Sequence, residues 1–277
     1  MIDCILDALL DTLKLIPYLF VTFIILEAIE HKLNKKTQKI ITKYKKLGPI
    51  FGGIFGGFPQ CGFSAMGANL YTVGIITKGT LISIFLSTSD EMLPIMIGEK
   101  VEPFIIFRII GFKIIIGIII GLIVDLIFKK KEDKNNIKDL CEGDHCHCKD
   151  GILKSSIVHT LKTSLFILIA DILIGFAIYY IGEDGLSTLL KSNNIFVYFG
   201  ASLLGLIPNC ASSIVLTKVY LSGIITIGVA LSGLLTSSGI GILLLFKNNK
   251  SFKDNMIILS IIYFVGVIIG FIIDLVI

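Results

Sequence analysis

The sequence predicts an all-α integral membrane protein made of two repeats of about five hydrophobic segments each, inserted in opposite orientations. Three observations predict this class: long apolar runs, an internal duplication, and basic residues gathered between the runs. Of the 277 residues, 54% are hydrophobic and 17% are charged, and the mean hydropathy is +0.89. A soluble domain of this length keeps a larger charged surface, because that surface must be wetted.

The apolar runs are long enough to cross a bilayer. A hydrocarbon core of roughly 30 Å needs about 20 apolar residues per helical crossing. Four runs meet this length: Leu9–Ile29, Pro103–Phe128, Ser156–Ile181 and Asn255–Ile277. No basic segment precedes the first run, which is also too long for the core of a signal peptide, so we expect it to remain as an anchor. We therefore expect a multi-pass protein of the cell membrane, with the lipid bilayer as its first partner.

A duplication fixes the repeat boundaries. The motif GGFPQCGFS at Gly56–Ser64 recurs as GLIPNCASS at Gly205–Ser213, and the same offset places Tyr71–Gly79 on Tyr220–Gly228. This ungapped agreement of polar, glycine and proline residues indicates two copies of one unit. We expect a first membrane repeat at 1–128, a cytoplasmic linker rich in His and Cys at 129–154, and a second membrane repeat at 155–277.

Each repeat is expected to contain a long helix, two short segments around a Pro-x-Cys break, a segment interrupted by Ser and Thr, and a final long helix. In the first repeat these lie at about 8–30, 47–58, 62–77, 79–98 and 103–128. In the second they lie at about 155–181, 196–207, 211–226, 228–246 and 255–277.

Basic residues predict the orientation of the repeats. The net charge is +4, and most of the basic excess lies in His31–Lys46, with smaller groups at Lys129–Lys131 and Lys247–Lys253. An odd number of crossings per repeat keeps all three groups in the cytoplasm, as the positive-inside rule requires, and places both chain termini outside. An even number would export Lys129–Lys131. Because the basic residues flank apolar spans, we expect no nucleic-acid partner.

The two Pro-x-Cys breaks predict re-entrant hairpins. Leu47–Thr77 offers 31 residues for two arms, so each arm rises only about 20–23 Å, which is short of a roughly 30 Å core. We expect Pro59–Cys61 and Pro208–Cys210 to form the tips of hairpins that enter from opposite faces. Two thin full crossings per pair are the alternative.

These breaks also predict a solute site. Non-helical backbone at membrane depth persists only when it is buried in protein or lines a wet cavity, and inverted-repeat carriers build their midplane sites from broken helices. The expected substrate-binding residues are Gln60, Cys61, Ser64, Ser87, Thr88, Ser89, Asp90, Asn209, Cys210, Ser212, Ser213, Thr236, Ser237 and Ser238. The alternative is that Pro and Gly only kink packed helices, the hydroxyls bond their own backbone, and the cysteines are small buried apolar groups.

Acidic residues inside apolar segments are candidates for ion coupling, because a charge at the bilayer centre is costly. Asp90, Glu91 and Asp171 are in such segments. The alternative for Asp90 and Glu91 is pairing with Lys78, Arg108 or Lys113. Asp125 and Asp274 lie near helix ends, where we expect the membrane interface.

The linker carries a separate set of candidate metal ligands: Cys141, His145, Cys146, His147 and Cys148. Thiols and imidazoles of this kind suit Zn²⁺, Cu(I) or a thiophilic metalloid. Their spacing matches no standard zinc finger, so we expect a capture or sensing segment rather than a rigid site. A solvated linker with incidental ligands is the alternative. No resident cofactor is expected.

The motifs at Pro59–Ser64 and Pro208–Ser212 resemble those of a family of bacterial and archaeal ten-helix membrane proteins described as heavy-metal or arsenic efflux permeases. Many members of that family are described as manganese transporters. The resemblance covers essentially the whole chain, including the linker. It implies a cytoplasmic-membrane exporter of a metal or metalloid, and ten helices would fit full crossings better than hairpins.

The leading functional hypothesis is a secondary exporter of arsenite or a related heavy metal, with Cys61 and Cys210 as ligands and Asp90 as a coupling group. A Mn²⁺ transporter is the first alternative, and a carrier of a small organic or sulfur-containing anion is the second. We do not expect an enzyme, because the four histidines lie in loops or at a helix edge, away from the cysteines. No Walker motif is present in the sequence, so energy would come from an ion gradient or a separate ATPase. A homo-oligomer is compatible with the sequence.

Overall fold

In the computed structural model, every element of the described residues is a helix. The structure describes residues 9–10, 12–13, 16–17, 20–21, 23–24, 47–58, 61–89, 92–128, 152–181, 195–208 and 210–276. The first half contains α3 (Gly48–Gly56), α4 (Cys61–Thr72), α5 (Lys78–Ser87), α6 (Met92–Gly98) and α7 (Pro103–Ile127). The long α8 (Ile152–Ile181) follows, and then α10 (Phe196–Gly205), α11 (Cys210–Leu221), α12 (Ile227–Thr236), α13 (Gly241–Asn248) and α14 (Phe252–Val276).

The helix bounds repeat with the offset found in the sequence. Adding 149 to the bounds of α4, α5 and α7 gives the bounds of α11, α12 and α14 at both ends. The short helices α3 and α6 match α10 and α13 to within one residue at each end. The helices expected from the sequence are therefore present in the described residues, within about five residues of the expected bounds. Most of the expected first helix at 8–30 lies outside the described residues.

Each half has α5 or its counterpart α12 at its centre. Helix α5 packs against α7 and α3, and α12 packs against α14 and α10. These helices cross closely at glycines: a Cβ added to Gly79 would lie 2.1 Å from the Gly121 carbonyl oxygen, and one added to Gly228 would lie 2.3 Å from that of Gly270. Small residues permit such close backbone approach between helices in a membrane.

Helix α3 runs beside α5 and ends where α5 ends. A Cβ on Gly48, at the start of α3, would touch Thr80 in the first turn of α5, and a Cβ on Gly56 would touch Ser87, its last residue. Helix α10 has the same relation to α12, because a Cβ on Gly205 would touch Thr236. The ends of α3 and α10 thus reach the depth at which α5 and α12 stop.

The segment that contains α5 and α6, and its counterpart with α12 and α13, are discontinuous helices. Thr88 leaves helical geometry at ψ 128°, and Pro94 falls in the first turn of α6, where its missing N–H breaks no hydrogen bond. In the second copy Ser237 leaves at ψ 96°, and Gly239 has φ +51°, a conformation that glycine adopts without strain.

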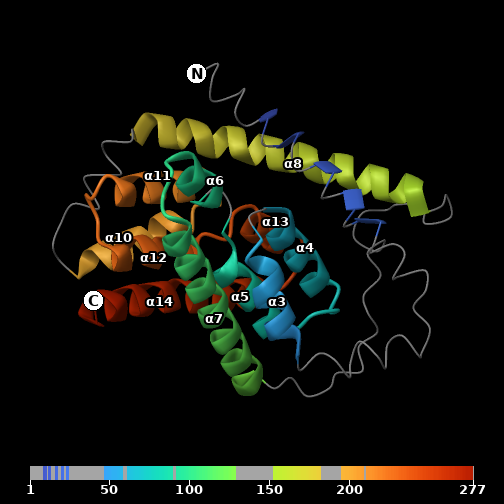
Figure 1. Cartoon of the computed structure of the whole chain (residues 1–277). Coiled ribbons are helices and arrows are strands. Elements are labelled where there is room, and N and C mark those ends of the chain that lie inside the picture. Colours follow the sequence, from blue (N-terminus) through green and yellow to red (C-terminus); the bar gives the residue numbers. More distant parts are fainter. Residues whose placement is uncertain are drawn as a thin grey trace.

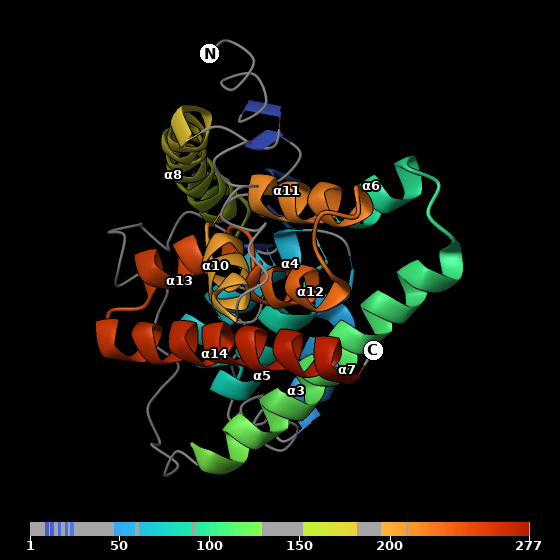
Figure 2. The same cartoon turned by 90° about the vertical axis from the view of Figure 1, so that its left-hand side faces the viewer.

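Four helical stretches of the described residues are long and apolar enough to cross a membrane. The two discontinuous ones, Lys78–Gly98 and Ile227–Asn248, have 69% and 89% of their most apolar window buried, against 28% for each of α7 and α14. The broken helices are therefore central, and α7 and α14 are peripheral. In Figure 2, α7 descends from right to left while α14 runs from left to right toward the C-terminus, so these helices run in broadly opposite directions. The chain is a helical, multi-pass membrane protein.

The two halves meet along two matched seams, α4 against α13 and α11 against α6 (Figure 1). At the first seam, a Cβ on Gly241 would lie 2.9 Å from the Cβ of Ser64. Helix α8 lies along one side of the molecule, where Lys247 of α13 places its Nζ atom 4.9 Å from the centre of the Phe166 ring.

Candidate functional site

The breaks in the two discontinuous helices are lined with buried hydroxyl side chains. Ser87, Thr88 and Ser89 end α5, and Thr236, Ser237 and Ser238 end α12; each is at most 2% exposed. All six were predicted as substrate-binding residues. Helix ends leave the carbonyls of the last turn without intrahelical partners, so a buried end needs donors from elsewhere.

In the first break the hydroxyls bond back to the carbonyls of α5. Ser87 Oγ donates to the Ser83 carbonyl at 2.7 Å, and Thr88 Oγ1 donates to the Ile84 carbonyl at 2.7 Å. Ser89 Oγ donates to the carbonyl of Ser87 at 3.2 Å. Only the bond from Ser89 reaches a carbonyl of the open end, because the Ser83 and Ile84 carbonyls also accept backbone N–H groups of α5 and its cap. Back-bonding of this kind offers the chain an alternative to continued helix.

The second break differs at one position. Thr236 Oγ1 donates to the carbonyls of Gly233 at 2.8 Å and of Ser202 in α10 at 2.9 Å. Ser237 Oγ is buried and has no hydrogen-bond partner among the described residues. A buried hydroxyl without a partner is costly, so Ser237 is the hydroxyl at the breaks that is most available to a solute.

Lys113 joins the two breaks. It lies in the middle of α7, is 1% exposed, and donates from Nζ to the carbonyl of Thr88 and, at 2.7 Å, to the carbonyl of Leu234 in the last turn of α12. Both acceptors lie at C-terminal helix ends, which carry partial negative charge. One ammonium group therefore bridges the broken helices of both halves at their centre.

Sequence reasoning named Lys113 only as a pairing partner for Asp90 or Glu91. A signal was available: in the 25-residue helix α7, Lys113 interrupts an apolar stretch, and the residue 149 positions later is Ile262. An ionisable residue in only one copy of a duplicated membrane helix indicates a function that the other copy does not need.

The short helices α4 and α11 bring further predicted residues to this region. Helix boundaries lie at both predicted breaks, because α3 ends at Gly56 and α4 begins at Cys61, while α10 ends at Gly205 and α11 begins at Cys210. Ser64 is fully buried and, through Gly241, abuts the start of α13, just after the second break. Ser212 and Ser213 are at most 2% exposed in the first turn of α11, and Ser212 Oγ donates to the Ile207 carbonyl at 3.3 Å.

Several predicted residues fall outside the described part of the chain. They are Gln60, Asp90, Glu91 and Asn209, the linker residues Cys141, His145, Cys146, His147 and Cys148, and the side chains of Cys61, Cys210 and Asp171. Their roles remain predictions. Within the described residues, no group of three or more His, Cys, Asp or Glu side chains is arranged to hold a metal ion.

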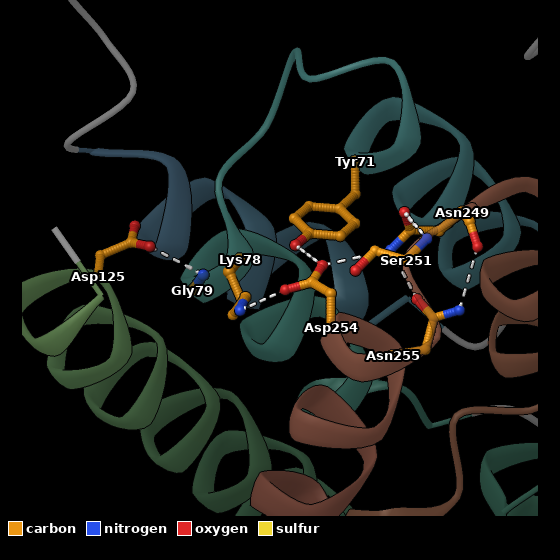
Figure 3. Close-up of polar contacts among 8 residues, drawn as sticks. All are labelled: Tyr71, Lys78, Gly79, Asp125, Asn249, Ser251, Asp254 and Asn255. Carbon is orange, nitrogen blue, oxygen red and sulfur yellow. Dashed lines mark hydrogen bonds and ion pairs between the residues drawn. The ribbon is translucent and has the colours of Figure 1, made fainter. Parts of the chain in front are cut away.

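A second polar region ties the halves together at one end of the molecule (Figure 3). Asp254, in the first turn of α14, accepts from the hydroxyl of Tyr71 at the end of α4 and pairs with Lys78 of α5 at 2.5 Å. Asn249 Nδ2 adds hydrogen bonds to Asp254 at 3.2 Å and to Asn255 Oδ1 at 2.6 Å. This end cluster, Tyr71–Lys78–Asn249–Asp254, has members from both halves.

Asp125 and Asp274 have matched structural roles. Asp125 accepts from the Gly79 backbone N–H at 2.8 Å and from Thr77 Oγ1 at 2.6 Å, and so caps the N-terminus of α5 from α7. Asp274 accepts from the Gly228 N–H at 2.9 Å and from the Thr226 hydroxyl, and so caps α12 from α14. A carboxylate at a helix N-terminus stabilises the partial positive charge there.

Comparison with known proteins identifies the family. A family profile described as "Putative, 10TM heavy-metal exporter" matches residues 1–184, which include the first repeat, the linker and all of α8. No curated protein and no solved structure matches the chain. The chain therefore belongs to the family described as "Putative, 10TM heavy-metal exporter".

Proposed function

We propose that the protein is a secondary carrier of the cell membrane that exports a heavy metal or metalloid, with arsenite as the leading solute. The observation that carries this proposal is the meeting of two buried, broken helices, one from each half, at a single ammonium group. Discontinuous helices whose ends converge in the middle of the molecule are the design by which inverted-repeat carriers build a solute site.

The inverted arrangement is part of this proposal. Two features support it: α7 and α14 run in broadly opposite directions, and the helix bounds repeat with a constant offset. In the proposed topology the end cluster lies at the cytoplasmic end, because Lys78 and Asp254 follow segments that the positive-inside rule places there. The capping group of Asp274 and Thr226 then lies at the outer end, where the second hairpin enters.

Re-entrant hairpins are likewise proposed. The packing of Gly48 near Thr80 and of Gly56 near Ser87 supports them, because α3 then extends only to the depth of the first break. The packing of Gly205 against Thr236 supports the same depth for α10. On this arrangement Cys61 and Cys210, with Gln60 and Asn209, begin their half-helices near the level of the two breaks.

Ligand chemistry favours arsenite as the solute, because the expected site contains two thiols. Arsenite is an uncharged acid at neutral pH and is thiophilic, so two thiols and neighbouring hydroxyls could take it. A carrier of a small organic or sulfur-containing anion is a further candidate, and it would use the partial positive charge at the N-termini of the half-helices. A Mn²⁺ carrier would need oxygen ligands from Asp90, Glu91, Gln60 and Asn209.

Arsenite transport is tested with everted membrane vesicles and with proteoliposomes of the purified chain. The Cys61→Ser/Cys210→Ser double variant should lose arsenite accumulation, whereas Cys4→Ser, which changes a thiol outside the hairpins, should keep it. Retention of arsenite accumulation by the double variant would remove the thiolate model. Loss of Mn²⁺ resistance in Asp90→Asn, with arsenite resistance unchanged, would establish the manganese alternative instead.

The linker ligands are proposed to capture the solute before transport. Their replacement in Cys141→Ser/Cys146→Ser/Cys148→Ser should raise the solute concentration needed for half-maximal transport and leave the maximal rate unchanged, because capture acts on supply rather than on translocation. Isothermal titration of the purified wild type and variant with Zn²⁺, Cu(I) and arsenite identifies the ligand. Unchanged transport and unchanged binding would assign the segment to a solvated linker.

A further inference from the structure

The surroundings of Lys113 are those of a cation site. Its Nζ atom contacts two backbone carbonyls, those of Thr88 and Leu234, which come from different halves and lie at the C-terminal ends of two half-helices. Carbonyls at such ends have no intrahelical partner and carry the negative end of the helix dipole. In carriers with broken helices, unwound carbonyls and half-helix C-termini are the groups that bind alkali cations.

An ammonium group can occupy such a site in place of a free ion. It carries the same single charge as Na⁺ or K⁺ and offers three hydrogen-bond donors. The Lys113 side chain reaches the site from α7, so its charge cannot diffuse away. Burial of this large side chain to 1% exposure leaves the ammonium among protein groups rather than in water.

We propose that Lys113 is a tethered cation that occupies a carbonyl site between the two broken helices and makes binding of a free alkali cation there unnecessary. It acts as a positioning residue: it holds the C-terminal ends of α5 and α12 together. Lys113 also bears on the transport cycle, and this part of the proposal rests on the proposed function. In such a cycle, movement of one half against the other must separate the Thr88 and Leu234 carbonyls that this ammonium joins.

The repeat supports a dedicated role for this residue. The position that corresponds to Lys113 in the second half is Ile262, which is fully buried in α14. The two long helices share two glycines and the capping carboxylate at matching positions, as Gly121 and Asp125 with Gly270 and Asp274 show. The ammonium is therefore a difference between copies that keep the same close helix crossing and the same helix cap.

The test is chemical rescue. Lys113→Ala removes Cγ, Cδ, Cε and Nζ, and n-propylammonium replaces these atoms. We expect the variant to lower the Tm by about 5 °C, because two buried carbonyls lose their donor. Millimolar n-propylammonium should restore about half of this shift, and Na⁺ should restore part of it. Lys113→Met keeps the stem without the charge, so its site is filled and n-propylammonium should have no effect.

Matched measurements separate this mechanism from simple packing. Arg108→Ala, an exposed cation on the same helix, should show neither the Tm loss nor the rescue. n-Propanol, which has the size of the rescuing ion without its charge, should not rescue Lys113→Ala. Lys113→Arg should keep a Tm close to that of the wild type, because it keeps a charged donor.

Transport gives a second, independent measure. Wild-type proteoliposomes should transport solute at the same rate when N-methylglucamine replaces all Na⁺ and K⁺. If the Tm of Lys113→Ala does not respond to n-propylammonium, or if wild-type transport stops without alkali ions, the tethered-cation proposal is overturned. The Tm arm needs no solute, so failure of the proposed export function leaves it intact and is recognised separately by absent wild-type transport.

Discussion

The matched caps of Asp125 and Asp274 allow a quantitative prediction. Asp125→Asn keeps the shape of the side chain but removes the charge that receives the Gly79 N–H at 2.8 Å and Thr77 Oγ1 at 2.6 Å. Hydrogen bonds to charged groups contribute about 1.5–3 kcal/mol each, neutral ones about 1 kcal/mol, and a charge at a helix end adds about 0.3–1 kcal/mol. The asparagine retains one neutral acceptor, so these figures add to a loss of about 2–6 kcal/mol in the free energy of unfolding, and the partial exposure of Asp125 favours the lower end of this range.

Asp274→Asn should cost at least as much, because Asp274 also accepts from the Tyr198 hydroxyl at 2.8 Å. The chain has no tryptophan, so unfolding of the purified protein in detergent is best followed by far-UV circular dichroism. Exposed Glu99→Gln is the control and should change stability by less than about 0.5 kcal/mol. The losses of stability in Asp125→Asn and Asp274→Asn should be additive, because the two caps lie in different halves. A cost for Asp125→Asn no larger than that of Glu99→Gln would refute the capping argument.

Three further predictions concern a helix crossing, the end cluster and the second break. Gly228→Ala should lower the Tm by several degrees, since its Cβ would lie 2.3 Å from the Gly270 carbonyl oxygen. The control Gly200→Ala meets open space and should be neutral or stabilising. Equal Tm values for the two variants would contradict the close crossing of α12 and α14. Asp254→Asn should lower the free energy of unfolding in detergent by about 1–3 kcal/mol, because it removes the charged partner of the largely buried Lys78. An unchanged free energy of unfolding would show that the end cluster does not contribute to stability. Ser237→Ala should leave the Tm unchanged or raise it, because the substitution removes a buried hydroxyl that has no hydrogen-bond partner among the described residues. If that hydroxyl contacts the solute, the same variant should also lower the solute flux. A clear decrease in Tm would contradict the lack of a partner.

Much of the helical framework could be predicted because the sequence contains two copies of it. Apolar length identified the helices, and the aligned Gly, Pro and polar residues fixed their order and their ends near Gly56, Cys61, Gly205 and Cys210. Charge placement predicted the orientation, which remains a prediction. These signals are local or periodic, so they survive without knowledge of packing.

The sequence predicted that Ser and Thr interrupt the segment at 79–98, but not that a helix ends there. Ser87–Ser89 contains neither Gly nor Pro, and Ser and Thr in membrane helices usually bond their own backbone. Pro94 was the missed signal, because a proline inside a continuous span from Lys78 to Gly98 would lack a donor and clash with the preceding turn. Its place in the first turn of a new helix removes both problems.

The candidate site was predicted in part for the same reason. Its hydroxyls could be named from sequence, but their partners could not, since the choice between a solute and a backbone carbonyl depends on how the last turns are packed. The junction at Lys113 depends on Leu234, which is 121 residues away, and no local pattern indicates that contact. Asp125 was expected at the membrane interface. Its role as the cap of the neighbouring helix α5 could not be predicted without the tertiary contacts.

The two copies differ at one buried position, where the first copy has Lys113 and the second has Ile262. This difference affects the relative free energies of conformations as well as the local contacts. In the inverted carrier proposed above, two identical copies would make the inward-open and outward-open forms equal in free energy, because exchanging the copies converts one form into the other. A charge carried by one copy removes that equality. The resting population of such a carrier would then favour one side of the membrane even before any solute or driving ion is bound.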